Sequence, residues 1–133
     1  MTIDQNRPRT VLVLIAEDEE PIAEVVSMVV EDLGYTPVVA VHGRQALELA
    51  RTEWPALLIT DLMMPHMSGA ELIAALRADA ETQGRRTIPV ILMTAASLAA
   101  ARAAGADVVL RKPFDLSELE ELLERFLDGH AFA

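Results

Sequence analysis

The chain has 133 residues, a formal net charge of −10 and no cysteine. This length suits a single domain with its own core, and the missing cysteine excludes disulfides, thiolate nucleophiles and cysteine metal sites. The acidic balance argues against duplex nucleic acid as a partner, and no apolar run is long enough to span a membrane.

Apolar runs of strand length alternate along the chain with segments whose apolar residues recur at helical spacing. In chain order, these patterns predict a strand at residues 11–16, a helix from Pro21 to Gly34, a strand at 36–41, a helix at 43–52, a strand at 57–61, a helix after Gly69, a loop at 82–87, a strand at 90–94, a helix at 95–104, a strand at 107–110 and a helix from about Leu116 to Gly129. Residues 1–10 are expected to form a flexible tail and 129–133 a short one, which leaves 11–128 as the domain.

The alternation of strands and helices predicts the α/β class, with a parallel sheet covered by helices on both faces. The strands are apolar throughout, as expected for strands buried on both sides. Pro37 cannot donate a backbone hydrogen bond and so places the second strand at the sheet edge. These features favour a doubly wound, flavodoxin-like sheet of five strands in the order 2-1-3-4-5.

Reactive side chains follow four of the five predicted strands. Glu17 and Asp18 follow the first, Asp61 ends the third, Thr94 ends the fourth and Lys112 follows the fifth. In a parallel sheet all these ends lie at one edge, where ligands bind. Each residue also has a structural explanation, because acids cap helices and a lone lysine is often a solvated surface residue. Their coincidence at one edge favours a functional site.

The three carboxylates would repel one another, and such clusters usually surround a cation. Oxygen ligands that leave room for water suit Mg²⁺. Lys112 adds a positive charge and Thr94 a hydroxyl donor. A metal ion, an ammonium and a hydroxyl around one carboxylate indicate a phosphoryl group carried by Asp61.

From about Val11 to Leu127 the chain resembles the receiver domains of bacterial two-component response regulators, including the single-domain chemotaxis regulators. The resemblance rests on short motifs that occur in the same order. They are Glu17-Asp18, Gly43 with Ala46-Leu47, Asp61-Leu62-Met63-Met64-Pro65 with Met67 and Gly69, Met93-Thr94-Ala95, Gly105-Ala106-Asp107 and Lys112-Pro113-Phe114.

The resemblance implies a role for each matching residue. Asp61 would be the phosphoryl acceptor, and Asp18 and Asp61 would bind Mg²⁺ through their side chains. Met63 would bind the metal through its backbone carbonyl and Glu17 through a water molecule. Lys112 would pair with the phosphoryl oxygens, and the Lys112–Pro113 bond would be cis. Thr94 would move to bond the phosphoryl group on activation.

Three positions depart from the family pattern. The acid pair is Glu-Asp where Asp-Asp is commoner, which lengthens the first arm. Val109 stands where the family usually has an aromatic switch residue. The stretch from Thr94 to Gly105 is about one helical turn shorter than the family norm. The second and third departures affect the surface that usually transmits the signal.

We expect a stand-alone cytoplasmic receiver, without an output domain, that accepts a phosphoryl group from a histidine kinase or a histidine phosphotransfer protein. Phosphorylation would shift an existing equilibrium and change binding to a downstream protein that the sequence does not name. Self-association into a homodimer is an open alternative. Beyond its own phosphorylation and dephosphorylation, no enzymatic activity is expected, and neither nucleic acid nor a membrane is an expected partner.

Two other function classes compete with this interpretation. The first is a phosphohydrolase that forms an aspartyl phosphate, but such enzymes usually have a second carboxylate near the nucleophile as general acid. Met63, two residues after Asp61, cannot transfer a proton. The second is a pseudo-receiver that binds a partner without phosphorylation, and the presence of Asp61, Thr94 and Lys112 argues against it.

Overall fold

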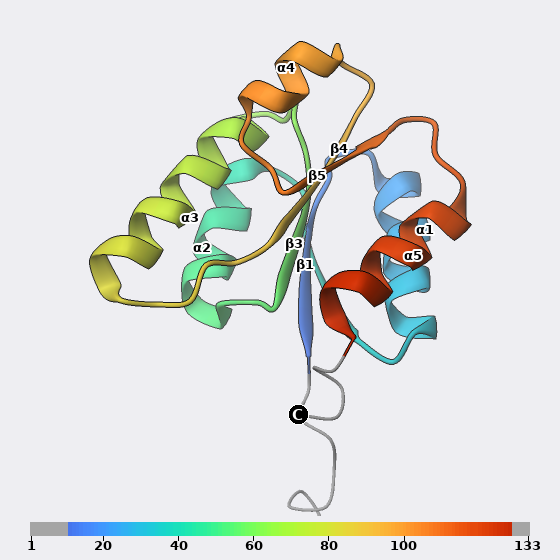
Figure 1. Cartoon of the computed structure of the whole chain (residues 1–133), viewed down its shortest axis with the longest axis horizontal. Helices are drawn as coiled ribbons and strands as arrows, with labels where there is room; N and C mark the ends of the chain where they lie inside the picture. Colours follow the sequence, from blue (N-terminus) through green and yellow to red (C-terminus); the bar gives the residue numbers. More distant parts are fainter. Residues whose placement is uncertain (1–10, 129–133) are drawn as a thin grey trace, which may run out of the picture.

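The computed structural model describes residues 11–128, which form one parallel sheet between two layers of helices (Figure 1). The elements are, in chain order, β1 (Leu12–Ala16), α1 (Glu20–Asp32), β2 (Thr36–Ala40), α2 (Gly43–Glu53), β3 (Leu57–Asp61), α3 (Gly69–Gln83), β4 (Val90–Thr94), α4 (Leu98–Ala103), β5 (Val108–Arg111) and α5 (Leu116–Leu127). The strand order β2-β1-β3-β4-β5 confirms the predicted topology. None of the helices in this range is both long and apolar enough to cross a membrane.

Alternate residues of each central strand enter different layers of the core. On β1, Leu14 packs in the cluster that includes Leu47 of α2, whereas Val13 and Ile15 pack in the cluster that includes Leu123 of α5. Figure 1 shows α1 and α5 on one face of the sheet and α2 and α3 on the other. Burial on both faces explains why the strands carry no polar alternation.

Local sequence signals set the ends of several helices. Pro21 lies in the first turn of α1, where its missing N–H has no helical partner to lose. At the start of α3, the Glu71 N–H donates to Ser68 Oγ (3.1 Å), and the Ser68 N–H donates to Glu71 Oε1 (3.0 Å). This reciprocal pair is a capping box. It explains why α3 begins directly after the loop that follows Asp61.

The predicted loop at residues 82–87 was wrong at its start, because α3 continues to Gln83. Thr82 is accommodated in the helix by donating its hydroxyl to the carbonyl of Ala78 (3.0 Å). The helix ends at Gly84, whose φ of +64° lies in the left-handed region that glycine adopts without strain. The predicted strand boundaries agree with the structure to within one residue.

The helix predicted at residues 95–104 is shorter in the structure, where α4 covers only Leu98–Ala103. Ser97 caps it, since its Oγ accepts the N–H of Ala100 (3.2 Å). The three residues between β4 and α4 therefore form a loop. The predicted tails at 1–10 and 129–133, and the predicted helix end at Gly129, lie outside the described residues.

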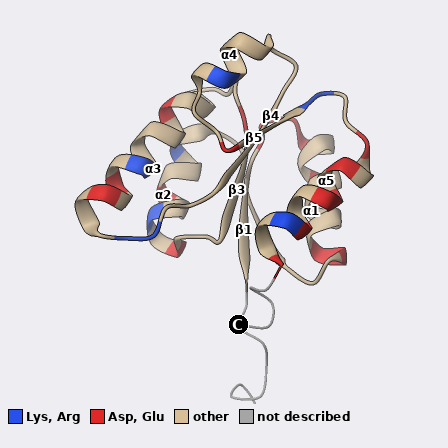
Figure 2. Cartoon of the chain, viewed as in Figure 1, with Lys and Arg blue, Asp and Glu red and all other residues tan. Residues whose placement is uncertain are grey.

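The buried polar and charged side chains of residues 11–128 gather at one end of the sheet. They are Glu17, Thr60, Asp61 and Thr94, at the carboxyl ends of β1, β3 and β4. Most other charged residues lie on outward-facing helix surfaces, with acidic residues prominent on α1 and α5 (Figure 2). Burial of charge is costly unless the group is paired, so this end of the sheet is the candidate site.

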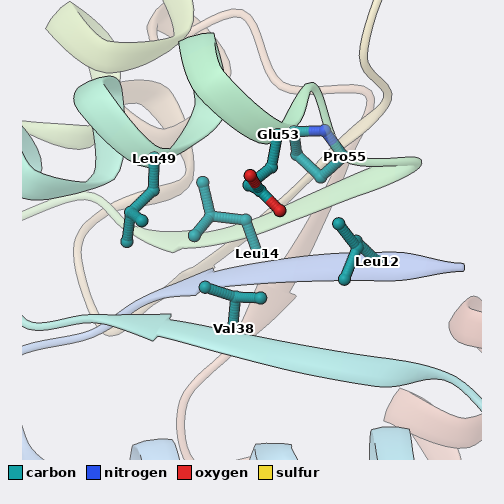
Figure 3. A pocket seen from close by; sticks show the side chains of 6 residues that line it. All are labelled: Leu12, Leu14, Val38, Leu49, Glu53 and Pro55. Carbon is teal, nitrogen blue, oxygen red and sulfur yellow. The ribbon is translucent and has the colours of Figure 1, made fainter. Parts of the chain in front are cut away.

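An apolar crevice lies between α2 and the first two strands (Figure 3). Leu14, Val38 and Leu49 line it, and Glu53 and Pro55 lie at one end. The crevice is too narrow to admit a water molecule. We therefore regard it as a packing defect and not as a binding site.

Candidate functional site

The carboxyl ends of the strands bring the predicted residues together at the upper end of the sheet in Figure 1. Asp61 is the last residue of β3, and Thr94 is the last residue of its neighbour β4. The backbone N–H of Lys112 donates to the Thr94 carbonyl (2.9 Å), which places Lys112 beside β4. The backbone N–H of Glu17, directly after β1, donates to the carbonyl of Ala40 at the end of β2 (3.0 Å). Each functional side chain thus starts from a backbone held by the sheet.

Lys112 connects the two buried carboxylates of the site. Its Nζ donates to Oε1 of Glu17 (2.8 Å) and to Oδ2 of Asp61 (3.1 Å). The Glu17 side chain is fully buried, and those of Lys112 and Asp61 are 14% and 11% exposed. The ammonium group therefore lies between the two negative charges and reduces their repulsion.

The second oxygen of Asp61 is held by backbone amides that the sequence analysis did not identify. The N–H of Leu62 donates to Asp61 Oδ1 (2.7 Å), and the N–H of Met63 makes a longer bond to the same oxygen (3.4 Å). Such contacts depend on how the chain turns after β3, and no side-chain signal in the sequence reports them. They fix the orientation of the Asp61 carboxylate.

The electrostatics of the site follow from burial and pairing. Burial raises the pKa of the Glu17 carboxyl above its ordinary 4.5, although hydrogen bonds from Lys112 and from the Glu19 amide oppose the shift. Burial lowers the pKa of Lys112, but its hydrogen bonds to Glu17 and Asp61 outweigh that effect and raise the pKa above its ordinary 10.5. The lysine is therefore a cation at neutral pH.

The acidic cluster fits a divalent cation. Glu17, Asp18 and Asp61 each offer a carboxylate oxygen, and these three oxygens lie within 4.8 Å of one another. Asp18 is exposed, so a metal ion bound there would keep contact with solvent. The all-oxygen donor set suits Mg²⁺. The Met63 side chain is 70% exposed, and the use of its backbone carbonyl as a ligand stays a prediction.

Thr94 is the residue predicted to respond to phosphorylation, and Val109 occupies the position where the family usually has an aromatic switch residue. The Thr94 side chain is buried, and its Oγ1 accepts the N–H of Ala96 (3.0 Å), so the hydroxyl is engaged with its own loop. Val109 is half-buried and packs against the cluster that contains Leu92 and Ala101. The structure therefore gives Val109 a packing role, while its role in switching stays untested.

The loop from Asp61 to α3 is held by close backbone contacts. The N–H of Gly69 donates to the carbonyl of Leu62 (2.8 Å). On the neighbouring helix, a Cβ atom on Gly43 would lie 2.1 Å from the carbonyl oxygen of Met67. Only glycine allows this approach, so the first residue of α2 also supports the Asp61 loop.

An apolar hollow of about 490 Å³ opens beside Lys112. Its walls come from the start of α1 and from the segment between β5 and α5. The apolar side chains that line it include Pro21, Ile22, Val25, Phe114 and Leu116. The Lys112–Pro113 peptide bond in this segment is cis, as predicted. Val25 and Leu116 are exposed apolar residues, and such a surface is typical of a protein contact.

A family model described as the response regulator receiver domain matches residues 13–124 of the chain. The chain belongs to this family. It is a receiver domain of the response regulators of two-component signalling, with the flavodoxin-like fold of that family, and the resemblance inferred from its motifs is confirmed.

Individual relatives agree with this assignment. The phosphate regulon transcriptional regulatory protein PhoB of Klebsiella pneumoniae is 38% identical over 111 residues, which are 80% of this chain and 47% of PhoB. The chain thus spans about half the length of the curated relatives it matches. The structure of the chemotaxis response regulator CheY4 of Vibrio cholerae is 30% identical, with a TM-score of 0.78, and the match covers 90% of this chain and all of CheY4.

A third comparison concerns the metal site. The receiver domain of the sensor histidine kinase PA1611 of Pseudomonas aeruginosa has a TM-score of 0.78 and 25% identity. The match covers 91% of this chain and all of that domain, and the PA1611 structure has a magnesium ion coordinated in its active site cleft.

Proposed function

We propose that the domain accepts a phosphoryl group on Asp61 from a phosphohistidine of a histidine kinase or a histidine phosphotransfer protein. The observation that carries this proposal is the placement of Asp61, whose two oxygens are oriented by Lys112 and by the Leu62 amide. The carboxylate is fixed at a strand end, with a cation beside it that can neutralise phosphoryl oxygens.

The transfer is balanced without a further reactant. An Asp61 carboxylate oxygen forms a P–O bond as the P–N bond to the donor histidine breaks, and the imidazole nitrogen keeps the electron pair and takes up a proton. Lys112 donates to a phosphoryl oxygen, and Thr94 gives up its Ala96 contact to do the same. Hydrolysis of the aspartyl phosphate then resets the domain, so its only catalysis is of its own phosphorylation state.

We assign the metal site to Mg²⁺ bound by the side chains of Asp18 and Asp61. The backbone carbonyl of Met63 would be a further ligand, and Glu17 would contact the ion through a water molecule. The bound ion would neutralise charge on the transferred phosphoryl group. The three carboxylate oxygens within 4.8 Å of one another and the magnesium ion in the similar PA1611 receiver domain support this assignment.

We infer that the donor and the target are proteins. The apolar hollow beside Lys112 can receive an apolar side chain of a docked partner, which favours a signalling module over a phosphohydrolase for small molecules. The net charge of −10 argues against direct contact with nucleic acid. A cytoplasmic location is part of this proposal.

The test is phosphorylation by acetyl phosphate with Mg²⁺, followed by intact-mass spectrometry. Wild type should gain the mass of one phosphoryl group, and Asp61→Asn should gain none, because the nearly isosteric amide is a far weaker nucleophile. Asp32→Asn, an exposed change at the end of α1, serves as the control and should label normally. Stable label on Asp61→Asn would refute Asp61 as the acceptor.

A further inference from the structure

The Glu17 side chain makes direct hydrogen bonds within the protein, which its predicted role of binding a metal through a water molecule does not require. It is fully buried, and both of its oxygens have protein partners. Oε1 accepts from Lys112 Nζ (2.8 Å), and Oε2 accepts from the Glu19 amide (3.2 Å). The bond to Lys112 is shorter than the one that Lys112 makes with Asp61 (3.1 Å). Glu17 is therefore the closer partner of the lysine.

Lys112 is the only lysine in the sequence, since the other ten of its eleven Lys and Arg residues are arginines. Its ammonium group has three N–H donors. Two of them are used by Glu17 and Asp61, so one remains for a phosphoryl oxygen. A lysine side chain has many rotamers, and its ammonium group tends to turn toward water. A further contact is therefore needed to keep the ammonium group beside Asp61, where the Lys112 side chain is largely buried.

We propose that Glu17 is a positioning residue that holds Lys112 beside Asp61. The relevance to phosphorylation rests on the proposed function, but the positioning itself does not. The Glu17 carboxylate reaches the ammonium group at 2.8 Å, and an aspartate at this position would have one methylene less with which to reach it. When Asp61 carries a phosphoryl group, the Glu17 contact keeps Lys112 where the phosphoryl oxygens arrive.

The first test measures the lysine itself, without metal or phosphodonor. Because there is one lysine, protein labelled with ¹⁵N-lysine has a single side-chain ammonium signal. In EDTA, wild type should show slow exchange of the ammonium protons with water. Glu17→Gln, of equal length but uncharged, should exchange about tenfold faster, since a hydrogen bond to a charged group is lost or weakened. Glu17→Asp should also exchange faster than wild type, because the aspartate side chain is too short to reach the ammonium group.

Glu20→Gln is the matched control, since it removes an exposed charge three residues away and should leave the ammonium exchange unchanged. Far-ultraviolet circular dichroism checks that each variant is folded. Wild-type exchange rates in both Glu17→Gln and Glu17→Asp would overturn the proposal. This result is independent of whether the wild type accepts a phosphoryl group.

The second test separates positioning from metal binding. The rate of phosphorylation by acetyl phosphate is measured across a Mg²⁺ series for wild type and Glu17→Asp. The shorter residue keeps its charge and can still act on the metal, so a role limited to metal binding predicts full rescue at high Mg²⁺. If Glu17 positions Lys112, the maximum phosphorylation rate of Glu17→Asp should be about tenfold lower than that of wild type, and saturating Mg²⁺ should not restore it. Full rescue would overturn the proposed role in phosphorylation.

Discussion

Gly69 packs its α-carbon directly against the backbone carbonyl of Asp61. A Cβ atom at position 69 would lie 2.2 Å from that carbonyl oxygen and 3.0 Å from the Cα of Leu62. The first residue of α3 is thereby fitted against the strand end that carries the acceptor. The sequence motif contains this glycine, but the reason for it is a contact across the loop.

Gly69→Ala should therefore destabilise the domain by about 1–3 kcal/mol, because the methyl group meets backbone atoms that cannot move independently of Asp61. Phosphorylation by acetyl phosphate should also slow, as the Asp61 loop is displaced. Gly84→Asn is the control, since a Cβ there meets nothing within 4 Å and asparagine tolerates a positive φ. Urea unfolding measures both variants. Equal stability of Gly69→Ala and wild type would contradict this account.

Mg²⁺ should stabilise the folded domain, because a cation relieves the repulsion among Glu17, Asp18 and Asp61. At ten times its Kd the expected gain is about 1.4 kcal/mol, visible as a rise in Tm. Asp18→Asn should weaken Mg²⁺ binding at least about tenfold, since even outer-shell changes have effects of that size. Isothermal titration calorimetry measures the affinity. Equal affinity in Asp18→Asn and wild type would remove Asp18 from the metal site.

Thr94→Ala should weaken the conformational response to phosphorylation, whereas Val109→Ala should leave it nearly intact. The hydroxyl of Thr94 can leave its Ala96 contact for a phosphoryl oxygen, but the short side chain of Val109 has few rotamers to exchange. Val109→Ala should instead lose about 1–2 kcal/mol of stability through packing.

The measurement is the set of amide chemical-shift changes on adding beryllofluoride, a phosphoryl mimic, with Mg²⁺. If Val109→Ala abolishes the shifts in α4 while Asp61 is still phosphorylated, then Val109 is a switch residue. Retention of the full response in Thr94→Ala would contradict the role of the hydroxyl.

Tyr35 should make stability fall at high pH. Burial, followed by the charges of Asp128 and Glu124, raises the pKa of Tyr35 above its ordinary 10.0, and its hydroxyl donates to the Leu127 carbonyl (3.4 Å). The folded state therefore holds this proton more tightly than the unfolded state. Its contribution is fully present below pH 10.0 and is lost as the pH rises through the folded-state pKa.

Wild type should consequently lose stability more steeply above pH 10 than Tyr35→Phe, which has no proton to release. Urea unfolding between pH 9 and pH 11.5 gives the two slopes. Because Lys112 is present in both proteins, its own titration cancels in the comparison. Parallel slopes would show that Tyr35 does not contribute.

Most of the candidate site could be predicted, because its residues follow strands whose ends meet in any parallel sheet. Asp61, Thr94 and Lys112 are brought together as expected. The Leu62 amide on Asp61 and the full burial of Glu17 were missed, since they depend on the path of the loops and on side-chain packing. The predicted helix at 95–104 was too long because the alanine-rich composition concealed the cap at Ser97.

The sequence by itself determined the fold class, the strand order and the edge at which the site lies. The apolar periodicity, Pro37 and the helix caps are local signals that can be identified in the sequence. An alternation of strands and helices is compatible with only a few topologies of a parallel sheet. Only the tertiary structure decided that Glu17 pairs with Lys112 and that Gly69 packs on Asp61. Glu17 and Lys112 are 95 positions apart in the chain. Their contact depends on side-chain length and burial within the folded sheet, and no local sequence pattern encodes it.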